Sequence, residues 1–165
     1  MKNIINIDDF YDLYYKIQQQ GINVITSRLG INQKSRVKKV WDRNSNPPIN
    51  WWSVPKVVER WNKLISDNYN LRYQDYFIDK YLKNKENLVL LSPGCGNATK
   101  EIEYAKHSQF KLVECFDISS AQVSRAQEKA KKKSLKNMIF SVNDLTTFKF
   151  KENYYDVIIF DMILH

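Results

Sequence analysis

Two of the chain's four glycines, Gly94 and Gly96, lie two residues apart, directly after the apolar run at 88–91. The segment that follows, residues 98–106, has the composition of a helix. A strand, a Gly-x-Gly turn and a helix in this order are typical of a cradle for a nucleotide-like ligand, because glycine has no Cβ to block a close approach. An ordinary strand-to-helix turn is the alternative interpretation.

Acidic residues follow the later apolar segments at the points where strands would end. Asp117 comes 21 residues after Gly96, about the spacing at which a second strand presents a carboxylate to a pair of ribose hydroxyls. Asp144 and Asp161 follow the next two apolar segments. Because ligands bind at the carboxyl ends of strands in open α/β sheets, these acids indicate one shared site. Capping of the following helix is the alternative role for Asp117 and Asp144.

Few residues are candidates for proton transfer or nucleophilic attack. His165 follows the fourth apolar segment and, with Asp161, is a candidate general base. Cys95 is expected to be a small filler between glycines, because no histidine stands near it in the sequence. Cys95 and Cys115 form no CxxC pair, so we expect no zinc site and no disulfide framework, and a reducing, cytoplasmic compartment.

The elements that must position these residues alternate along the second half of the chain. Short, nearly continuous apolar segments separate helical ones, as expected for a parallel sheet covered on both faces. Residues 86–165 are therefore predicted to be an α/β domain with a doubly wound, mostly parallel sheet of about four strands. Because such a sheet normally continues past its fourth strand, we expect a fragment whose sheet is completed by a missing C-terminal half or by a dimer partner.

Residues 1–85 are predicted to be a mostly helical N-terminal region that extends or caps this domain. The clearest helix begins after Ser53, has Pro55 in its first turn, and carries apolar residues at i, i+3, i+4 and i+7. Further helices are expected at 31–42 and 71–82.

Positive charge is concentrated in two segments, 34–43 and 120–137, within a net charge of +8. A nucleic-acid surface is one interpretation. Solvated helix faces are the interpretation we prefer, because neither segment interleaves aromatic residues with its charges. We therefore expect a small-molecule substrate and no nucleic-acid partner. We expect no membrane contact either, since no apolar run has the length of a bilayer span and acids at Asp8 and Asp9 come too early for a signal peptide.

Four motifs, in order and at this spacing, resemble the first half of the class I, seven-stranded, Rossmann-like S-adenosylmethionine-dependent methyltransferases. The motifs are LLSPGCGNA at 90–98, ECFDIS at 114–119, FSVNDL at 140–145 and YYDVIIFDMILH at 154–165. The resemblance implies that S-adenosylmethionine is bound by residues on three strand ends, namely Ser92, Gly94, Cys95, Gly96, Asp117, Ile118, Asp144 and Leu145.

By resemblance, Asp117 accepts hydrogen bonds from the ribose hydroxyls, and Asp144 with the backbone near Leu145 meets the adenine amino group. Residues from Phe160 onward face the methionine end and the substrate. The chain departs from the family at two positions. Ser92 stands where the family usually has an acid that recognises the cofactor's amino group, and Ala98 stands where a third glycine is frequent.

The sequence thus predicts transfer of a methyl group from S-adenosylmethionine to a small-molecule acceptor. The sulfonium is already an activated donor, so the protein has to align acceptor and methyl group rather than supply a nucleophile. Three alternatives stay open: an NAD-dependent oxidoreductase, whose third glycine would fall at Thr99; a nucleic-acid methyltransferase; and an inactive, truncated remnant.

Overall fold

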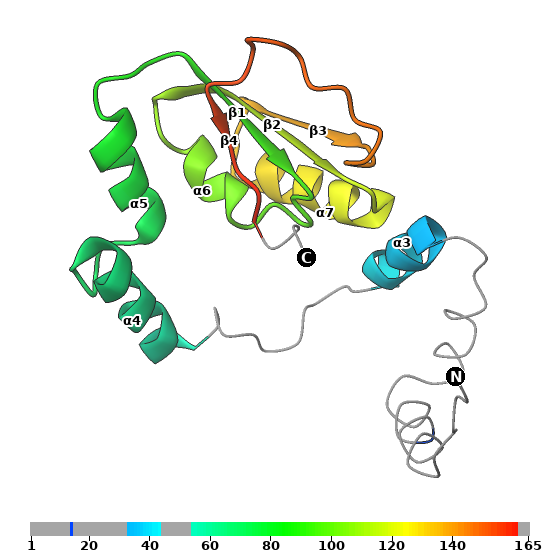
Figure 1. Ribbon diagram of the computed structural model, residues 1–165, viewed down its shortest axis with the longest axis horizontal. Helices are drawn as coiled ribbons and strands as arrows, with labels where there is room; N and C mark the ends of the chain where they lie inside the picture. Colours follow the sequence, from blue (N-terminus) through cyan, green and yellow to red (C-terminus); the bar gives the residue numbers. More distant parts are fainter. Residues whose placement is uncertain (1–13, 15–32, 44–53, 162–165) are drawn as a thin grey trace, which may run out of the picture. The chain divides into compact units, whose positions relative to one another are not determined.

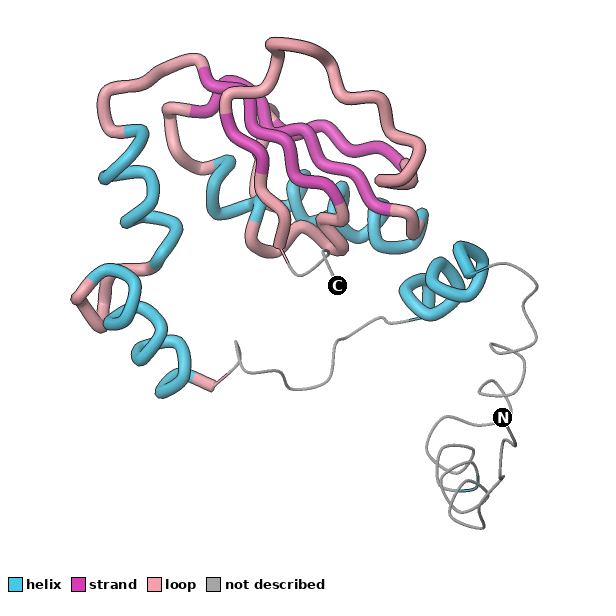
Figure 2. Tube along the Cα trace, viewed as in Figure 1, coloured by secondary structure: helices cyan, strands magenta, loops and turns pink. Residues whose placement is uncertain are grey.

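The computed structural model describes Tyr14, residues 33–43 and residues 54–161 (Figures 1 and 2). The chain divides into two compact units, Met1–Arg43 and Asn44–His165. The first unit contains the helix α3, Gln33–Arg43, which confirms the basic helix predicted at 31–42. The second contains every strand and the remaining helices that the structure describes.

Four parallel strands form one sheet with the spatial order β3-β2-β1-β4 (Figure 2). The strands are β1 Leu88–Pro93, β2 Phe110–Asp117, β3 Met138–Val142 and β4 Val157–Ile158. The predicted α/β fold with about four parallel strands is therefore confirmed. From β1 the chain adds β2 and then β3 on one side of β1, and it then crosses back to place β4 on the other side of β1. The strand order therefore reverses between β1 and β4. Such a switch point is where open α/β sheets bind ligands, outside the carboxyl ends of the strands.

Two helices cover one face of the sheet (Figure 1). They are α6, Glu101–Ala105, and α7, Ser120–Lys132, and both connect neighbouring parallel strands as right-handed crossovers do. The core between sheet and helices is built around fully buried side chains such as those of Leu90 and Val113. Ser119 caps α7 by accepting a hydrogen bond from the Gln122 N–H at 3.1 Å.

The opposite face is covered differently from the expectation of helices on both sides. The connection between β3 and β4, residues 143–156, contains no helix and lies across this face. Phe148 stacks on Phe116 with ring centroids 4.2 Å apart. Lys151 and Tyr155 reach Glu114 at 3.3 and 3.4 Å. Aromatic stacking and a half-buried polar cluster therefore replace a packed helix here.

Helices α4, Pro55–Ser66, and α5, Tyr73–Phe77, precede the sheet, and α5 continues as the π-helical segment η2, Ile78–Leu82. These positions confirm the helices predicted after Ser53 and at 71–82. The N-cap of α4 is Val54, which provides no side-chain hydrogen bond, and Ser53 itself lies outside the described residues. The predicted division of the chain into residues 1–85 and 86–165 stays a prediction.

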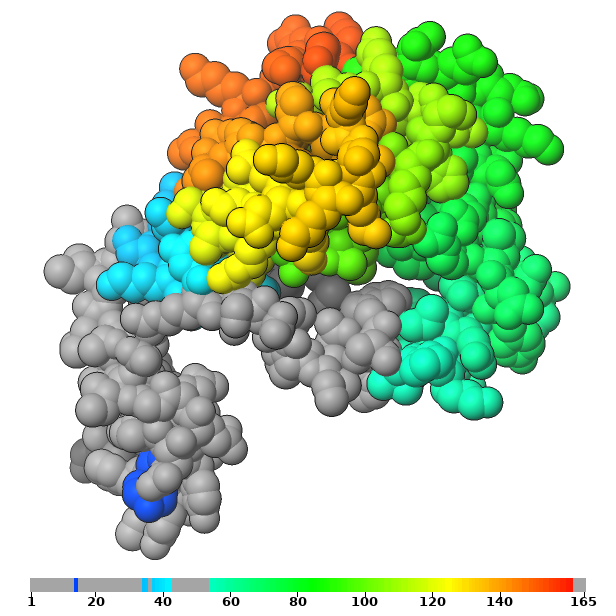
Figure 3. Space-filling model, turned by 180° about the vertical axis from the view of Figure 1, so that it is seen from behind, coloured from blue at the N-terminus to red at the C-terminus, as the bar shows by residue number. Residues whose placement is uncertain are grey.

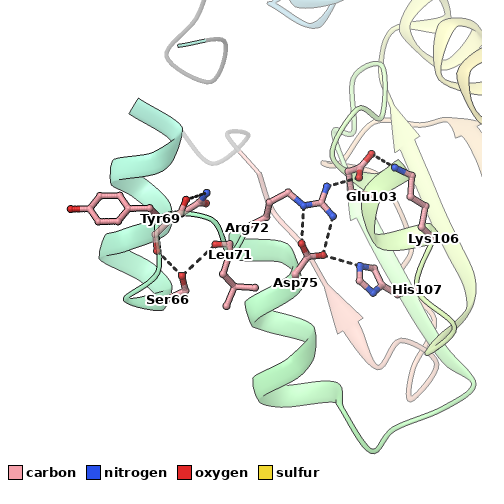
Figure 4. A network of polar contacts seen from close by, with 9 residues as sticks. Ser66, Tyr69, Leu71, Arg72, Asp75, Glu103, Lys106 and His107 are labelled. Atoms are coloured by element: carbon pink, nitrogen blue, oxygen red, sulfur yellow. Dashed lines mark hydrogen bonds and ion pairs between the residues drawn. The ribbon is translucent and has the colours of Figure 1, made fainter. Parts of the chain in front are cut away.

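An ion-pair network joins the start of α5 to α6 (Figure 4). Arg72 bonds Asp75 at 2.8 and 3.0 Å and Glu103 at 2.6 Å. These carboxylates raise the pKa of Arg72 above its ordinary value. His107 Nε2 lies 3.2 Å from Asp75. The contacts hold the helices before the sheet against the first crossover helix. Within the described residues, no helix combines the length and apolar character needed to cross a bilayer.

Candidate functional site

The loop after β1 has the backbone that its glycines were expected to provide. Gly94 and Gly96 have φ angles of 64° and 54°, in the left-handed region that residues with a Cβ rarely adopt. The Cys95 N–H donates to the Phe116 carbonyl at 3.1 Å, which fixes the loop against the end of β2. A Cβ placed on Gly96 would have no protein atom within 4 Å. The backbone of Gly96 therefore faces open space that a ligand can enter.

Asp117 joins this loop to the end of β2. Its Oδ2 accepts from the Gly96 N–H at 2.9 Å, and its Oδ1 accepts from the Ser119 N–H at 2.8 Å. The spacing of 21 residues thus brings the predicted ribose acid and the predicted glycine loop into direct contact. Each carboxylate oxygen can accept more than one hydrogen bond, so Asp117 keeps acceptor capacity for two hydroxyls. Ile118, predicted to contact the cofactor, is half-buried between Asp117 and Ser119, and its contact with the cofactor stays a prediction.

The end of β3 lies next to Asp117. Val142 pairs with Asp117, and the Asn143 N–H donates to the Asp117 carbonyl at 3.1 Å. Asp144 Oδ1 accepts from the N–H and the hydroxyl of Thr146 at 2.8 and 2.7 Å, which closes a local turn. The alternative of helix capping is wrong for Asp144, because no helix follows it in residues 143–156. Its contact with adenine, and that of the half-buried Leu145, stay predictions.

A cavity of about 290 Å³ lies at the switch point between β1 and β4. It is lined by α4, α5, α6 and the segment after β4, with side chains that include Trp61, Tyr73, Glu101, Tyr104, Phe160 and Asp161. Concave, largely aromatic surfaces with a few polar groups are typical of small-molecule sites. Asp161, a candidate general base, therefore lies in a pocket, whereas His165, the other candidate, lies outside the described residues.

The charged groups of this cavity come from α6 and from the end of β4. Lys100 and Asp161 form an ion pair. Glu101 is 4% exposed, and its Oε1 accepts from the Ser92 hydroxyl at 2.8 Å. Burial raises the pKa of Glu101, and it raises the pKa of Tyr104 to about 12, so this phenol stays neutral. The lining contains two carboxylates, Glu101 and Asp161, and one lysine, Lys100. This excess of acidic groups favours a ligand with a cationic group.

The sequence did not single out Lys100 or Glu101. Ser92, predicted to contact the cofactor, is 1% exposed and points at Glu101 on the helix-covered face. An acid in the first turn of a helix is common, so only the side chain's burial distinguishes Glu101, and that depends on the packing of α6 against β1.

The third left-handed position of the loop is Ala98, with φ 54° and 0% exposure. We expect Ala98→Gly to change the free energy of unfolding by less than about 1 kcal/mol. Relief of the left-handed strain, about 1 kcal/mol, offsets the lost buried methyl, about 0.8 kcal/mol, and the added freedom of the unfolded chain. Urea unfolding measures this.

Ala126, equally buried within α7, is the matched control. Ala126→Gly should cost about 2 kcal/mol, because it removes a methyl and weakens a helix with no strain to relieve. Equal losses in the two variants would show that the φ angle of Ala98 carries no strain.

Comparison with known proteins shows which family the second half of the chain resembles. Residues 84–165 match the family model of a methyltransferase domain. This part of the chain belongs to that family. The resemblance inferred from the four motifs is therefore confirmed at the level of the family. No curated protein matches the chain in sequence.

Solved structures with the same fold include methyltransferases. Magnesium protoporphyrin IX methyltransferase (ChlM) from Synechocystis PCC 6803 aligns with a TM-score of 0.57 and 21% identity in its structure with bound SAH. Its structure with bound SAM aligns with a TM-score of 0.58 and 20% identity. These alignments cover 81% and 82% of this chain but only 60% and 64% of the ChlM chain. The chain thus spans less than two thirds of the length of ChlM.

A third structure, the [4+2]-cyclase SpnF, aligns with a TM-score of 0.52 and 16% identity over 76% of this chain and 48% of its own. At these identities the likeness establishes the fold. Because a cyclase shares it, the reaction has to be argued from the site.

Proposed function

We propose that the chain binds S-adenosylmethionine at the carboxyl ends of β1, β2 and β3 and contributes to methyl transfer to a small-molecule acceptor. The observation that carries the proposal is the pairing of Gly96 with Asp117 beside open space, because it puts bare backbone and a ribose acceptor together. Membership of the methyltransferase domain family supports the same conclusion, as do the SAM and SAH named in the ChlM structures.

In this proposal the chain's own residues bind and orient. The sulfonium of the bound cofactor supplies an activated methyl group. Gly94 and Gly96 allow its close approach, and Asp117 fixes the ribose. The neighbouring cavity, with Phe160 and Asp161 on its wall, holds the acceptor in line with the methyl group. A base such as Asp161 or His165 is needed only for an acceptor that loses a proton.

Observations on the described residues favour a small molecule over a nucleic acid. The site is a concave aromatic cavity rather than an open basic groove. The lysines of α7 and its C-terminal turn, Lys131, Lys132 and Lys133, are exposed on the surface that α7 forms (yellow in Figure 3). Lys131 and Lys132 lie in the last turn of the helix and Lys133 is its C-cap, a place where the helix dipole stabilises cations without any ligand.

The edge of the sheet at β4 and the two cysteines bear on the protein's partners and its compartment. Ile158 of β4 and Phe160 just after it are 43% and 42% exposed. We expect a C-terminal half or a second copy to cover them. Cys95 and Cys115 are free thiols, which agrees with a reducing cytoplasm.

Calorimetric titration of the purified chain with S-adenosylhomocysteine and, separately, with NADH tests the proposal. We expect heat of binding and a rise in melting temperature with S-adenosylhomocysteine alone. Binding of NADH instead would favour the oxidoreductase, and binding of neither would favour the inactive remnant. RNA binding that weakens steeply with salt would favour a nucleic-acid methyltransferase.

A further inference from the structure

A buried acid stands beside the position where the family's acid is missing. Ser92, at the end of β1, occupies the place of that acid. Its hydroxyl donates to Glu101 Oε1 over 2.8 Å, from the strand to the first turn of α6. Both side chains are almost completely buried, at 1% and 4% exposure. A carboxylate is thus present at this corner, but it is supplied by the helix instead of the strand.

Burying this carboxylate is costly. A carboxylate that leaves water loses more solvation free energy than one hydrogen bond from a neutral hydroxyl restores. Burial therefore raises the pKa of Glu101. The charged groups that face it are Lys100 and Asp161, which pair with each other, and Lys129 of α7. Lys129 donates to the Thr99 hydroxyl at 2.9 Å. Glu101 itself lines the cavity at the switch point, so a ligand's cation can reach it.

We propose that Glu101, oriented by Ser92, binds the ammonium group of the cofactor's methionine moiety. The inference rests on the proposed function and assigns a residue to the amino-acid end of that site. The cation supplies the charge partner that the buried carboxylate otherwise obtains only in part. The hydroxyl of Ser92 fixes the carboxylate's orientation and leaves its charge intact, as a positioning residue does.

The test compares two ligands in one variant. S-adenosylhomocysteine carries the ammonium group, and 5′-methylthioadenosine has the same adenosine and thioether but no amino-acid part. Glu101→Gln keeps the shape and the bond from Ser92 but removes the charge. We expect it to weaken S-adenosylhomocysteine binding about 10- to 100-fold, the range of a charge-assisted hydrogen bond, and to leave 5′-methylthioadenosine binding unchanged. Calorimetry measures both.

Glu103→Gln is the matched control on the same helix. Glu103 bonds Arg72 and Lys106 on the protein surface, away from the cavity lining, so its variant should bind both ligands as the wild type does. In the Glu101→Gln background, Ser92→Asp restores an acid at the strand position. It should recover most of the lost affinity for S-adenosylhomocysteine.

Each outcome separates the two proposals. Unchanged S-adenosylhomocysteine affinity in Glu101→Gln overturns this inference and leaves the proposed function standing. An equal loss for both ligands also overturns it, because the variant would then act on the fold of the loop. Wild-type protein that binds neither ligand overturns the proposed function and the inference with it.

Discussion

Asp117→Ala is expected to lower the affinity for S-adenosylhomocysteine by about 100-fold and to destabilise the protein by about 3 kcal/mol. The affinity falls because the carboxylate's bonds to the ribose hydroxyls are lost. The stability falls because the N–H groups of Gly96 and Ser119 lose a charged acceptor. Calorimetric titration below the melting temperature and denaturant unfolding measure the two effects separately.

Asp156→Ala is the matched control for this prediction. Asp156 Oδ2 also accepts from a backbone N–H, that of Val89 at 2.8 Å, but at the opposite end of β1 from the glycine loop. We expect a loss of about 1 kcal/mol in stability and no change in affinity. A similar affinity loss in both variants would mean that Asp117 acts through stability. An Asp117→Ala protein that binds normally would remove the ribose assignment.

Much of the fold could be predicted from apolar patterning and from the residues that begin and end each segment. The strands β1, β2 and β3 form where apolar runs stand in the sequence. β1 and β2 are buried between neighbouring strands, whereas β3 lies at the edge of the described sheet and pairs with β2 alone. Strand β4 is only Val157–Ile158, shorter than its apolar segment, since it pairs with β1 alone at the edge of the described sheet. The π-helical turn η2 has no recognisable sequence signal, because its i→i+5 bonds arise from local packing.

The site was predictable where the chemistry is local and not where it depends on packing. Gly96 and Asp117 carry signals of residue type and spacing, and their hydrogen bond shows that the two residues lie together. Their contact with the cofactor stays a prediction. The turn that Asp144 closes with Thr146 is equally local. In contrast, Glu101 becomes a site candidate only because α6 packs it against Ser92. The hydrogen bond between Ser92 on β1 and Glu101 on α6 depends on how the helix packs against the strand. The spacing of residues in the sequence does not predict it.

Gly96→Ala is the second variant for which we expect a large effect. At φ 54° an alanine costs about 1 kcal/mol in stability. Its methyl meets no protein atom within 4 Å, so the ligand-free fold accommodates it without a clash. A cofactor that passes close to this backbone needs the space that the methyl fills. We therefore expect the affinity for S-adenosylhomocysteine to fall by about 10- to 100-fold, measured by calorimetric titration.

The control for Gly96→Ala is a variant that introduces similar backbone strain but places no methyl group in the candidate site. Asn153 has a φ of 51° in the connection between β3 and β4, at an exposed turn. Asn153→Ala should cost about as much stability as Gly96→Ala, because asparagine tolerates this conformation better than alanine does, and it should leave affinity unchanged. If Gly96→Ala binds as tightly as the control, no ligand approaches this backbone. The glycines would then serve the turn alone, and Asp117 would be a structural acceptor.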